Sequence, residues 1–269
     1  MIQNTIGFLG SGQMARALAG GFVASGKIEA EQVKYYNPGD ENAAKFQEAV
    51  PGALRCSTVE ELMDQAELVW LAVKPQILES VARPLAKHVR AEQVMVSVAA
   101  GITLPVLADW LGHNRIVRVM PNTPCLVGKG VSVYSCGGSI TADDKLQVHT
   151  LLQSVGLSRE VPEKLIDPIT GVSGSGPAFV MTVIEALADG GVKAGVPRAL
   201  ALELAIATLA GSAELLKQTG KHPAELRDQV ASPAGTTIYG LSALEAGGLR
   251  ASLIDAVFRS SSRAKKLAP

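Results

Sequence analysis

GFLGSGQMA at residues 7–15 is the stretch that decides the fold of this chain. It joins an apolar run at Thr5–Leu9 to a helical pattern, and Gly10, Gly12 and Ala15 stand in the G-x-G-x-x-A spacing of dinucleotide-binding turns. Gly10 permits a tight turn, Gly12 lets the backbone approach a pyrophosphate, and Ala15 keeps the helix close to the sheet. The helix start adds free N–H groups and a positive dipole end for phosphates. We therefore expect a dinucleotide-binding unit at the beginning of the chain.

The rest of the first half repeats this alternation of short apolar runs and helical patterns. We expect strands at Thr5–Leu9, Gln32–Tyr36, Leu68–Ala72, Val94–Val98, Arg115–Met120 and Val131–Ser135. We expect helices at Gln13–Ser25, Glu41–Ala49, Thr58–Gln65, Ile77–His88 and Leu104–Leu111. Strands that are apolar throughout are typical of a parallel sheet covered on both faces. The pattern predicts an α/β fold, with an N-terminal doubly wound sheet of the Rossmann type.

The second half shows only helical patterns, rich in alanine and leucine and broken by glycine or proline. We expect helices at Pro177–Ala194, Pro197–Gln218, Pro223–Ala231, Thr236–Ala246 and Leu249–Leu267. The expected domains are therefore residues 1–163, which bind the dinucleotide, and residues 164–269, which are all-helical. Within the latter, Ala205–Ala213 is small or apolar on nearly every side. Such a segment is buried either against a second chain, the more economical explanation, or at the centre of its own bundle.

Composition excludes several classes of protein. The chain has 269 residues, of which 47% are hydrophobic, and its 25 basic residues balance 25 acidic ones. No basic excess is available for nucleic acid, and the longest uncharged run, Pro168–Ile184, is too short to cross a bilayer. The N-terminus lacks the pattern of a secretion signal. Three separated cysteines without a CxxC pair disfavour a disulfide framework and a zinc site. We expect a cytoplasmic protein.

The loops after the expected strands carry the candidate cofactor contacts, because open α/β sheets bind ligands at the carboxyl ends of their strands. Asn37 stands where an acid would bind the ribose of NAD, and a neutral residue there tolerates a 2′-phosphate, which favours NADPH. Against this, no arginine is adjacent and the nearest cations are Lys34 and Lys45, so NADH stays open. The alternative for the other loops is ordinary turn formation. The candidate cofactor-binding residues are Gly10, Ser11, Gly12, Gln13, Met14, Asn37, Ala72, Val73, Lys74, Ala99, Ala100 and Asn122.

Two polar clusters stand in the helical half. Ser173–Pro177 is expected to open a helix that its serines cap, or to form an interdomain hinge. Ser232–Thr237 opens another helix, whose free N–H groups and hydroxyls could bind a carboxylate or could simply be a capped helix start. No histidine falls in a candidate site loop, and Lys193 is read as a solvated helix-end charge. A site without an acid suits a protonated imine, which already carries its proton, better than a carbonyl.

The chain resembles the pyrroline-5-carboxylate reductase family over nearly its whole length. The resemblance is carried by IGFLGSGQMARAL at 6–18, AVKPQ at 72–76, SVAAGIT at 97–103, RVMPNTP at 118–124, GVSGSGPA at 171–178, ALADGGVKAGVP at 186–197, and 222–245, which contains VASPAGTT. It implies NAD(P)H-dependent reduction of 1-pyrroline-5-carboxylate to L-proline, the last step of proline biosynthesis. It also implies a homodimer with interlocked C-terminal helices, in some members a decamer built of five dimers.

The resemblance further assigns site residues in the helical half. Substrate-binding positions are Ser173, Ser175, Ser232, Gly235, Thr236 and Thr237, and Thr237 lies against the ring nitrogen as the catalytic position. Two departures stand out: Gln13 replaces a frequent asparagine, and Ala234 replaces a usual glycine, which costs of order 1 kcal/mol if φ is positive there. Two alternatives remain open from the residues: a β-hydroxyacid dehydrogenase, with Lys193 as its acid, and a dinucleotide sensor without turnover.

Overall fold

The computed structural model describes residues 2–267, which fall into two compact units. Residues 2–175 and 258–267 form the first unit, and residues 176–257 form the second. Residues 164–175 and 258–267 thus belong to the unit that contains the sheet. Within this unit the Ser261 Oγ donates to the carbonyl of Pro168 at 3.0 Å, which joins the two segments. A functional boundary after residue 163 stays a prediction.

The first unit is built on one eight-stranded sheet with the order β3-β2-β1-β4-β5-β6-β7-β8. The strands are β1 (Ile6–Leu9), β2 (Val33–Tyr36), β3 (Leu54–Arg55), β4 (Leu68–Leu71), β5 (Val94–Ser97), β6 (Ile116–Met120), β7 (Gly130–Cys136) and β8 (Gly156–Glu160). The expected doubly wound α/β fold is confirmed. The two strands absent from the expectation, β3 and β8, lie at the sheet edges and have many exposed residues, so they lack the apolar signature of central strands.

One pair breaks the expected parallel order. β6 and β7 are antiparallel, with Val117 opposite Cys136 and Met120 opposite Val133. Only a short 3-10 helix, Thr123–Val127, connects them. A parallel connection needs a crossover of a dozen or more residues, so the expectation of parallel strands was wrong at this point.

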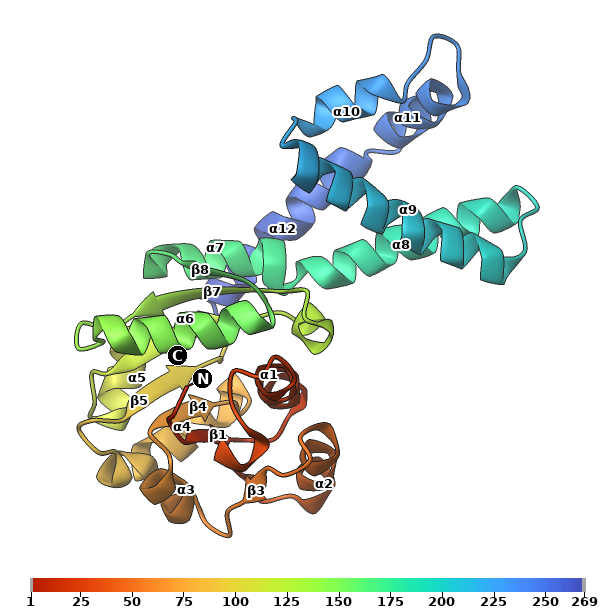
Figure 1. The fold of residues 1–269 in the computed structure, drawn as a ribbon. Helices are drawn as coiled ribbons and strands as arrows, with labels where there is room; N and C mark the ends of the chain where they lie inside the picture. The colour runs from red at the N-terminus through yellow and green to blue at the C-terminus, as the bar shows by residue number, and fades with distance from the viewer. Residues whose placement is uncertain (1, 268–269) are drawn as a thin grey trace. The chain divides into compact units, whose positions relative to one another are not determined.

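Helices cover both faces of the sheet (Figure 1). They are α1 (Gln13–Ala24), α2 (Asp40–Ala49), α3 (Val59–Gln65), α4 (Pro75–Leu85), α5 (Leu104–Leu111), α6 (Ala142–Ser154) and α7 (Ile166–Ile169). α1, α2 and α6 pack on one face, in the cluster that contains Phe8 and Trp70. α3, α4 and α5 pack on the other face, in the cluster that contains Leu9 and Leu71. Adjacent residues of one strand thus enter opposite cores, which explains why these strands are apolar throughout.

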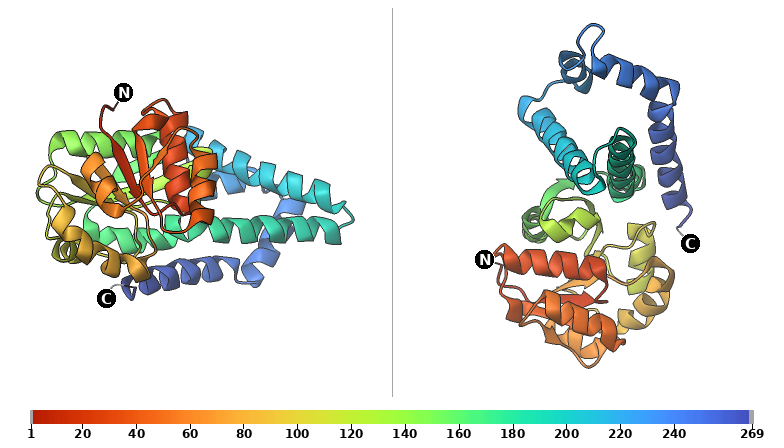
Figure 2. Two further views of the ribbon diagram at one scale, coloured as in Figure 1. Left: turned by 90° about the horizontal axis from the view of Figure 1, so that it is seen from below. Right: turned by 90° about the vertical axis from the view of Figure 1, so that its right-hand side faces the viewer.

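The second unit is helical, as expected. It contains α8 (Gly176–Lys193), α9 (Arg198–Thr219), α10 (Pro223–Gln229), α11 (Thr236–Ala246) and the first part of α12 (Leu249–Lys265). α8 and α9 lie side by side (Figures 1 and 2), joined by a small core of Ala188, Ala201 and Ala205. Large apolar side chains of both helices stay exposed, among them Leu204 at 52% and Met181 at 62%.

The exposed apolar surface bears on the membrane question. The helical runs 163–193 and 198–219 are long and apolar enough to cross a bilayer by length and composition alone, although only 11% of each apolar window is buried. The expectation that no segment reaches this length was wrong, because it counted uncharged runs only, whereas a membrane helix tolerates isolated charges. A surface between subunits produces the same pattern.

Candidate functional site

The carboxyl ends of β1, β2, β4 and β5 meet at one edge of the sheet, as expected. The backbone N–H of Gly10 donates to the Tyr36 carbonyl at 2.9 Å, and the N–H of Ala72 donates to the Leu9 carbonyl at 2.8 Å. The chain leaves β1 toward β2 on one side, and β4 lies on the other side. This reversal of strand order is where doubly wound sheets bind a nucleotide.

The glycine turn after β1 has the geometry that a pyrophosphate needs. Gly10 has φ +98°, and a Cβ there would lie 2.8 Å from the Ala72 carbonyl oxygen. Gly12 faces open space, and no side chain in the described chain caps the start of α1. The Ser11 hydroxyl is fully buried and has no partner among residues 2–267. A bound phosphate would satisfy this hydroxyl and the free N–H groups, so the residues present fit a dinucleotide.

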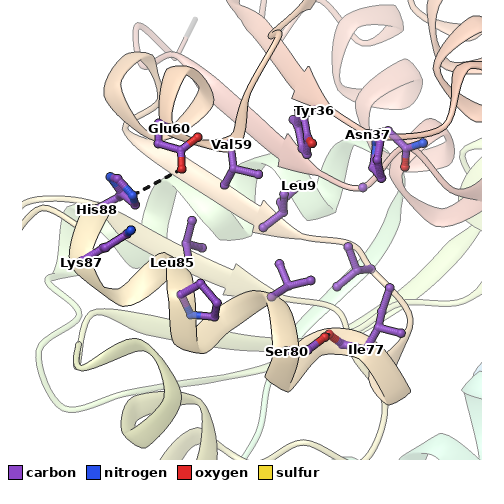
Figure 3. A pocket seen from close by; sticks show the side chains of 15 residues that line it. Leu9, Tyr36, Asn37, Val59, Glu60, Ile77, Ser80, Leu85, Lys87 and His88 are labelled. Carbon is purple, nitrogen blue, oxygen red and sulfur yellow. Dashed lines mark hydrogen bonds and ion pairs between the residues drawn. The ribbon is translucent and has the colours of Figure 1, made fainter.

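A pocket of about 410 Å³ opens beside this turn (Figure 3). Its walls are mostly apolar, as a purine ring requires, and Leu9, Val59, Val73, Ile77 and Val81 line it together with Tyr36, Asn37 and Pro38. Figure 3 shows Asn37 near one end and Glu60, Lys87 and His88 near the other. The ring of His88 lies 3.5 Å from the Glu60 carboxylate. Contrary to expectation, one histidine therefore lines a candidate site.

The structure brings an arginine to Asn37. Arg55 Nη2 donates to the Asn37 carbonyl at 3.2 Å and to Asp40 Oδ1 at 2.8 Å. The expectation that only Lys34 and Lys45 stand near was wrong, because it counted neighbours in sequence. Parallel pairing of β2 and β3 places Tyr35 opposite Arg55. Only the two-residue strand β3 could have signalled this, and its sequence is too short to show a pattern.

Asn122 occupies a buried position between two loops. Its amide nitrogen donates to the Ser173 carbonyl at 2.9 Å, and its side-chain oxygen accepts from the Val131 N–H at 2.8 Å. Asn122 thus fixes the loop after β6 to residues 170–174. Its contact with a nicotinamide stays a prediction, as do the contacts of Ala72, Val73, Lys74, Ala99 and Ala100.

Ser173 and Ser175 do not cap a helix start, so that expectation was wrong. Residues 170–174 form a π-helical turn between α7 and α8, and the Ser173 hydroxyl donates back to the Ile169 carbonyl at 3.3 Å. The helix begins upstream of the serines and runs through them. π-turns are frequent at functional sites, and Gly174 is needed here because a Cβ would lie 2.8 Å from Met120 Cε.

The start of α11 has the geometry expected of a carboxylate site. Gly235 is the N-cap, and no side chain of the described residues caps this helix. A Cβ on Gly235 would collide with the Ser232 hydroxyl, so glycine lets that hydroxyl lie beside the helix start. Ala234 has φ +58°, the left-handed conformation suspected from the sequence. The N–H groups of Thr236 and Thr237 therefore begin a helix with a free anion-binding end.

The other titratable groups give no second site. Cys56 and Cys125 are buried thiols, and burial raises the pKa of both. No cluster of three metal-binding side chains occurs within residues 2–267. His222 caps α10 by accepting from the Ala224 N–H at 3.2 Å. Lys193 is exposed in the last turn of α8, as expected for a helix-end charge.

Comparison with known proteins identifies both parts of the chain. Residues 163–267 match the description pyrroline-5-carboxylate reductase dimerisation, and residues 5–101 match NADP oxidoreductase, coenzyme F420-dependent. Pyrroline-5-carboxylate reductase 3 of Mus musculus is 46% identical over 97% of this chain and 95% of its own length. The pyrroline-5-carboxylate reductase of Glycine max is 43% identical over 98% of this chain and 96% of its own length.

Solved structures agree. A pyrroline carboxylate reductase of Plasmodium falciparum with NADP bound has a TM-score of 0.92, 33% identity, and full coverage of both chains. A pyrroline-5-carboxylate reductase of Coxiella burnetii has a TM-score of 0.89 and 31% identity, again with both chains fully covered. The two alternatives left open by the residues are thereby set aside. The chain uses NAD(P)H, self-associates through its helical half, and reduces 1-pyrroline-5-carboxylate to L-proline. It belongs to the pyrroline-5-carboxylate reductase family.

Proposed function

We propose that the start of α11 binds the substrate carboxylate. The proposal is supported by the N-terminus of this 11-residue helix, which no side chain of the described residues caps and where the Ser232 hydroxyl packs against the Gly235 N-cap. Backbone N–H groups and the helix dipole stabilise an anion at such a position. Ser232, Gly235, Thr236 and Thr237 are the proposed contacts, and they hold the substrate by the group that does not react.

Thr237 has the proposed catalytic role, with its hydroxyl against the ring nitrogen of the substrate. Ser173, on the π-turn, and Ser175, directly after it, are proposed further contacts. When bound, the reduced nicotinamide supplies a hydride to the imine carbon. The protein residues position the substrate, and no protein acid is required, because the protonated imine yields a neutral amine directly. Lys193, exposed at the end of α8, takes no part.

The cofactor contacts are proposed from the nucleotide edge of the sheet. Gly10, Ser11, Gly12, Gln13 and Met14 surround the start of α1, where no side chain of the described residues caps the helix and the space beside Gly12 is open. The apolar pocket beside Asn37 suits the adenine ring. Lys74 stands exposed at the N-cap of α4, close in sequence to Ala72 and Val73, where a phosphate or ribose contact is proposed.

The number of subunits in the assembly and the location of the protein in the cell are also proposals. The exposed apolar side chains of α8 and α9, such as Met181, Leu204 and Ile206, support burial against a second copy. We propose a homodimer, assembled into a decamer of five dimers, that is cytoplasmic and binds neither nucleic acid nor membrane. Light scattering after size exclusion gives the mass directly, and a mass of two protomers would contradict the decamer.

Thr237→Ala tests the proposed site. Loss of a hydrogen bond to a charged partner costs about 1.5–3 kcal/mol, so we expect KM for the imine to rise about 10- to 100-fold with the Kd of NADPH unchanged. Thr219→Ala is the matched control, because that hydroxyl makes only local bonds at the end of α9 among the described residues: it donates to the Leu215 carbonyl at 2.8 Å and accepts from the Lys221 N–H at 3.4 Å. Weaker NADPH binding by Thr237→Ala, with unchanged KM for the imine, would refute the assignment.

A further inference from the structure

Arg55 is placed beside the nucleotide edge by the sheet and not by the sequence around it. β3 pairs with β2 so that Arg55 stands opposite Tyr35, and the N–H of Cys56 donates to the Tyr35 carbonyl at 2.8 Å. The guanidinium then reaches the Asn37 carbonyl at 3.2 Å. Its position is thus set by backbone pairing on one side and by the Asn37 loop on the other.

A second pocket of about 340 Å³ lies at this point, lined by Tyr36, Asn37, Pro38, Arg55, Cys56 and Ser57. It shares Tyr36, Asn37 and Pro38 with the larger apolar pocket. The same three residues therefore separate a pocket suited to a purine from a pocket that contains a guanidinium, an amide and a hydroxyl. Because the two pockets share these residues, a ribose attached to a base in the first pocket would lie beside the second.

The ion pair between Arg55 and Asp40 is weak. Asp40 Oδ1 accepts from Arg55 Nη2 at 2.8 Å, but the Asp40 side chain is 91% exposed. Ion pairs this exposed contribute little, because water screens them. A phosphate dianion offers more charge and several oxygens to the planar fork of the guanidinium, so it competes well with a single exposed carboxylate.

The Asn37 side chain supports this arrangement without adding charge. Its oxygen accepts from the Ser11 N–H at 3.4 Å, and its nitrogen donates to the Gly39 carbonyl at 2.8 Å. The other carboxylate near the pocket, Glu61, accepts from the Ser57 N–H at 2.7 Å and is thereby held. No acid stands at the end of β2, where one would bind the two ribose hydroxyls of NADH and repel a phosphate.

We propose that Arg55 is the residue that discriminates NADPH from NADH, by binding the 2′-phosphate in the pocket between Asn37 and Ser57. The proposal rests on the NAD(P)H-dependent activity already established and adds the determinant of its cofactor choice. Without the phosphate, the exposed Asp40 carboxylate is the ion-pair partner of the guanidinium, and the phosphate replaces it.

Calorimetry with 2′,5′-ADP and 5′-AMP tests the phosphate contact without turnover. Arg55→Gln should weaken 2′,5′-ADP about 10- to 100-fold, the range for hydrogen bonds to charged groups, and leave 5′-AMP within about twofold. Arg55→Lys should recover part of the loss. Arg83→Gln is the matched control, because Arg83 is also a half-exposed arginine that pairs with carboxylates, Glu79 and Asp109, and does not line either pocket.

Steady-state kinetics gives the second readout. Arg55→Gln should raise KM for NADPH by a similar factor, with kcat and KM for NADH nearly unchanged, and Asp40→Asn should lower KM for NADPH. Equal weakening of 5′-AMP and 2′,5′-ADP would show a structural role for Arg55 and overturn the proposal. Unchanged binding of 2′,5′-ADP to Arg55→Gln would overturn it as well, while leaving the reductase activity intact.

Discussion

Replacing Ala234 by glycine tests whether the start of α11 is formed under backbone strain. Ala234 is the one non-glycine residue with positive φ within residues 2–267, at +58°. Its side chain is exposed, so removing the methyl group sacrifices no burial. The substitution therefore changes backbone energetics and almost nothing else.

The expected magnitude follows from two opposing effects. The left-handed conformation costs a non-glycine residue about 1–2 kcal/mol, and Ala234→Gly removes that cost. Glycine in turn loses about 0.5–1 kcal/mol more chain entropy on folding than alanine does. We expect a net gain of about 0.5–1 kcal/mol in the free energy of unfolding. KM for the imine should stay within about twofold, because the helix start is already formed with alanine.

Ala231→Gly is the control that separates these effects. Ala231 lies in the same loop but does not have positive φ. Glycine there increases the chain entropy lost on folding and removes no backbone strain, so it should lower the free energy of unfolding by about 0.5–1 kcal/mol. Urea midpoints of both variants and the parent chain are compared at one protomer concentration, because association adds to stability. If Ala234→Gly destabilises as much as Ala231→Gly, the strain inferred from φ is absent.

Three further outcomes are expected. Gly10→Ala should weaken NADPH binding and lower the urea midpoint, because its Cβ would lie 2.8 Å from the Ala72 carbonyl oxygen at φ +98°; unchanged values of both would contradict the turn geometry. Arg118→Met should cost about 3–5 kcal/mol in urea unfolding, because Arg118 is 2% exposed and its loss removes the cation that pairs with the mostly buried Asp167 and Glu163 carboxylates, leaving Glu163 with the Leu104 N–H; a cost below about 1 kcal/mol would contradict it. Burial, then Glu160, raises the pKa of Cys136 to about 11, so its rate of reaction with a thiol reagent should rise about tenfold per pH unit from pH 8 to 10. If the reaction rate already stops rising at pH 9, the pKa of Cys136 is lower than expected. In urea, where the burial is lost, Cys136 should react at the same rate as a free thiol.

Much of the fold was predictable because local patterns carry it. The central strands enter two cores, so their runs are apolar on both faces, and the helices between them show amphipathic periods and clear ends. Edge strands are not enclosed by two cores, so their residues need not be apolar. β3 and β8 are largely exposed and contain few apolar residues in a row. The antiparallel direction of β7 depends on the length of a connection rather than on the residues of the strand.

The features of the site also fall into those set by neighbouring residues and those set by tertiary contacts. Glycine spacing at Gly10 and Gly12 and the polar start of α11 are local, since a turn and a helix end depend on neighbouring residues, and both were expected from the sequence. The partner of Asn37 is not local: only the pairing of β2 with β3 brings Arg55 to it, across 18 residues. The π-turn at Ser173 likewise depends on Met120 and Asn122, which belong to another strand end. The sequence by itself determined which segments turn, cap and pack, because those choices are made within a few residues. Which charges meet was decided only by tertiary structure, because sheet register and loop packing join residues that the chain keeps far apart.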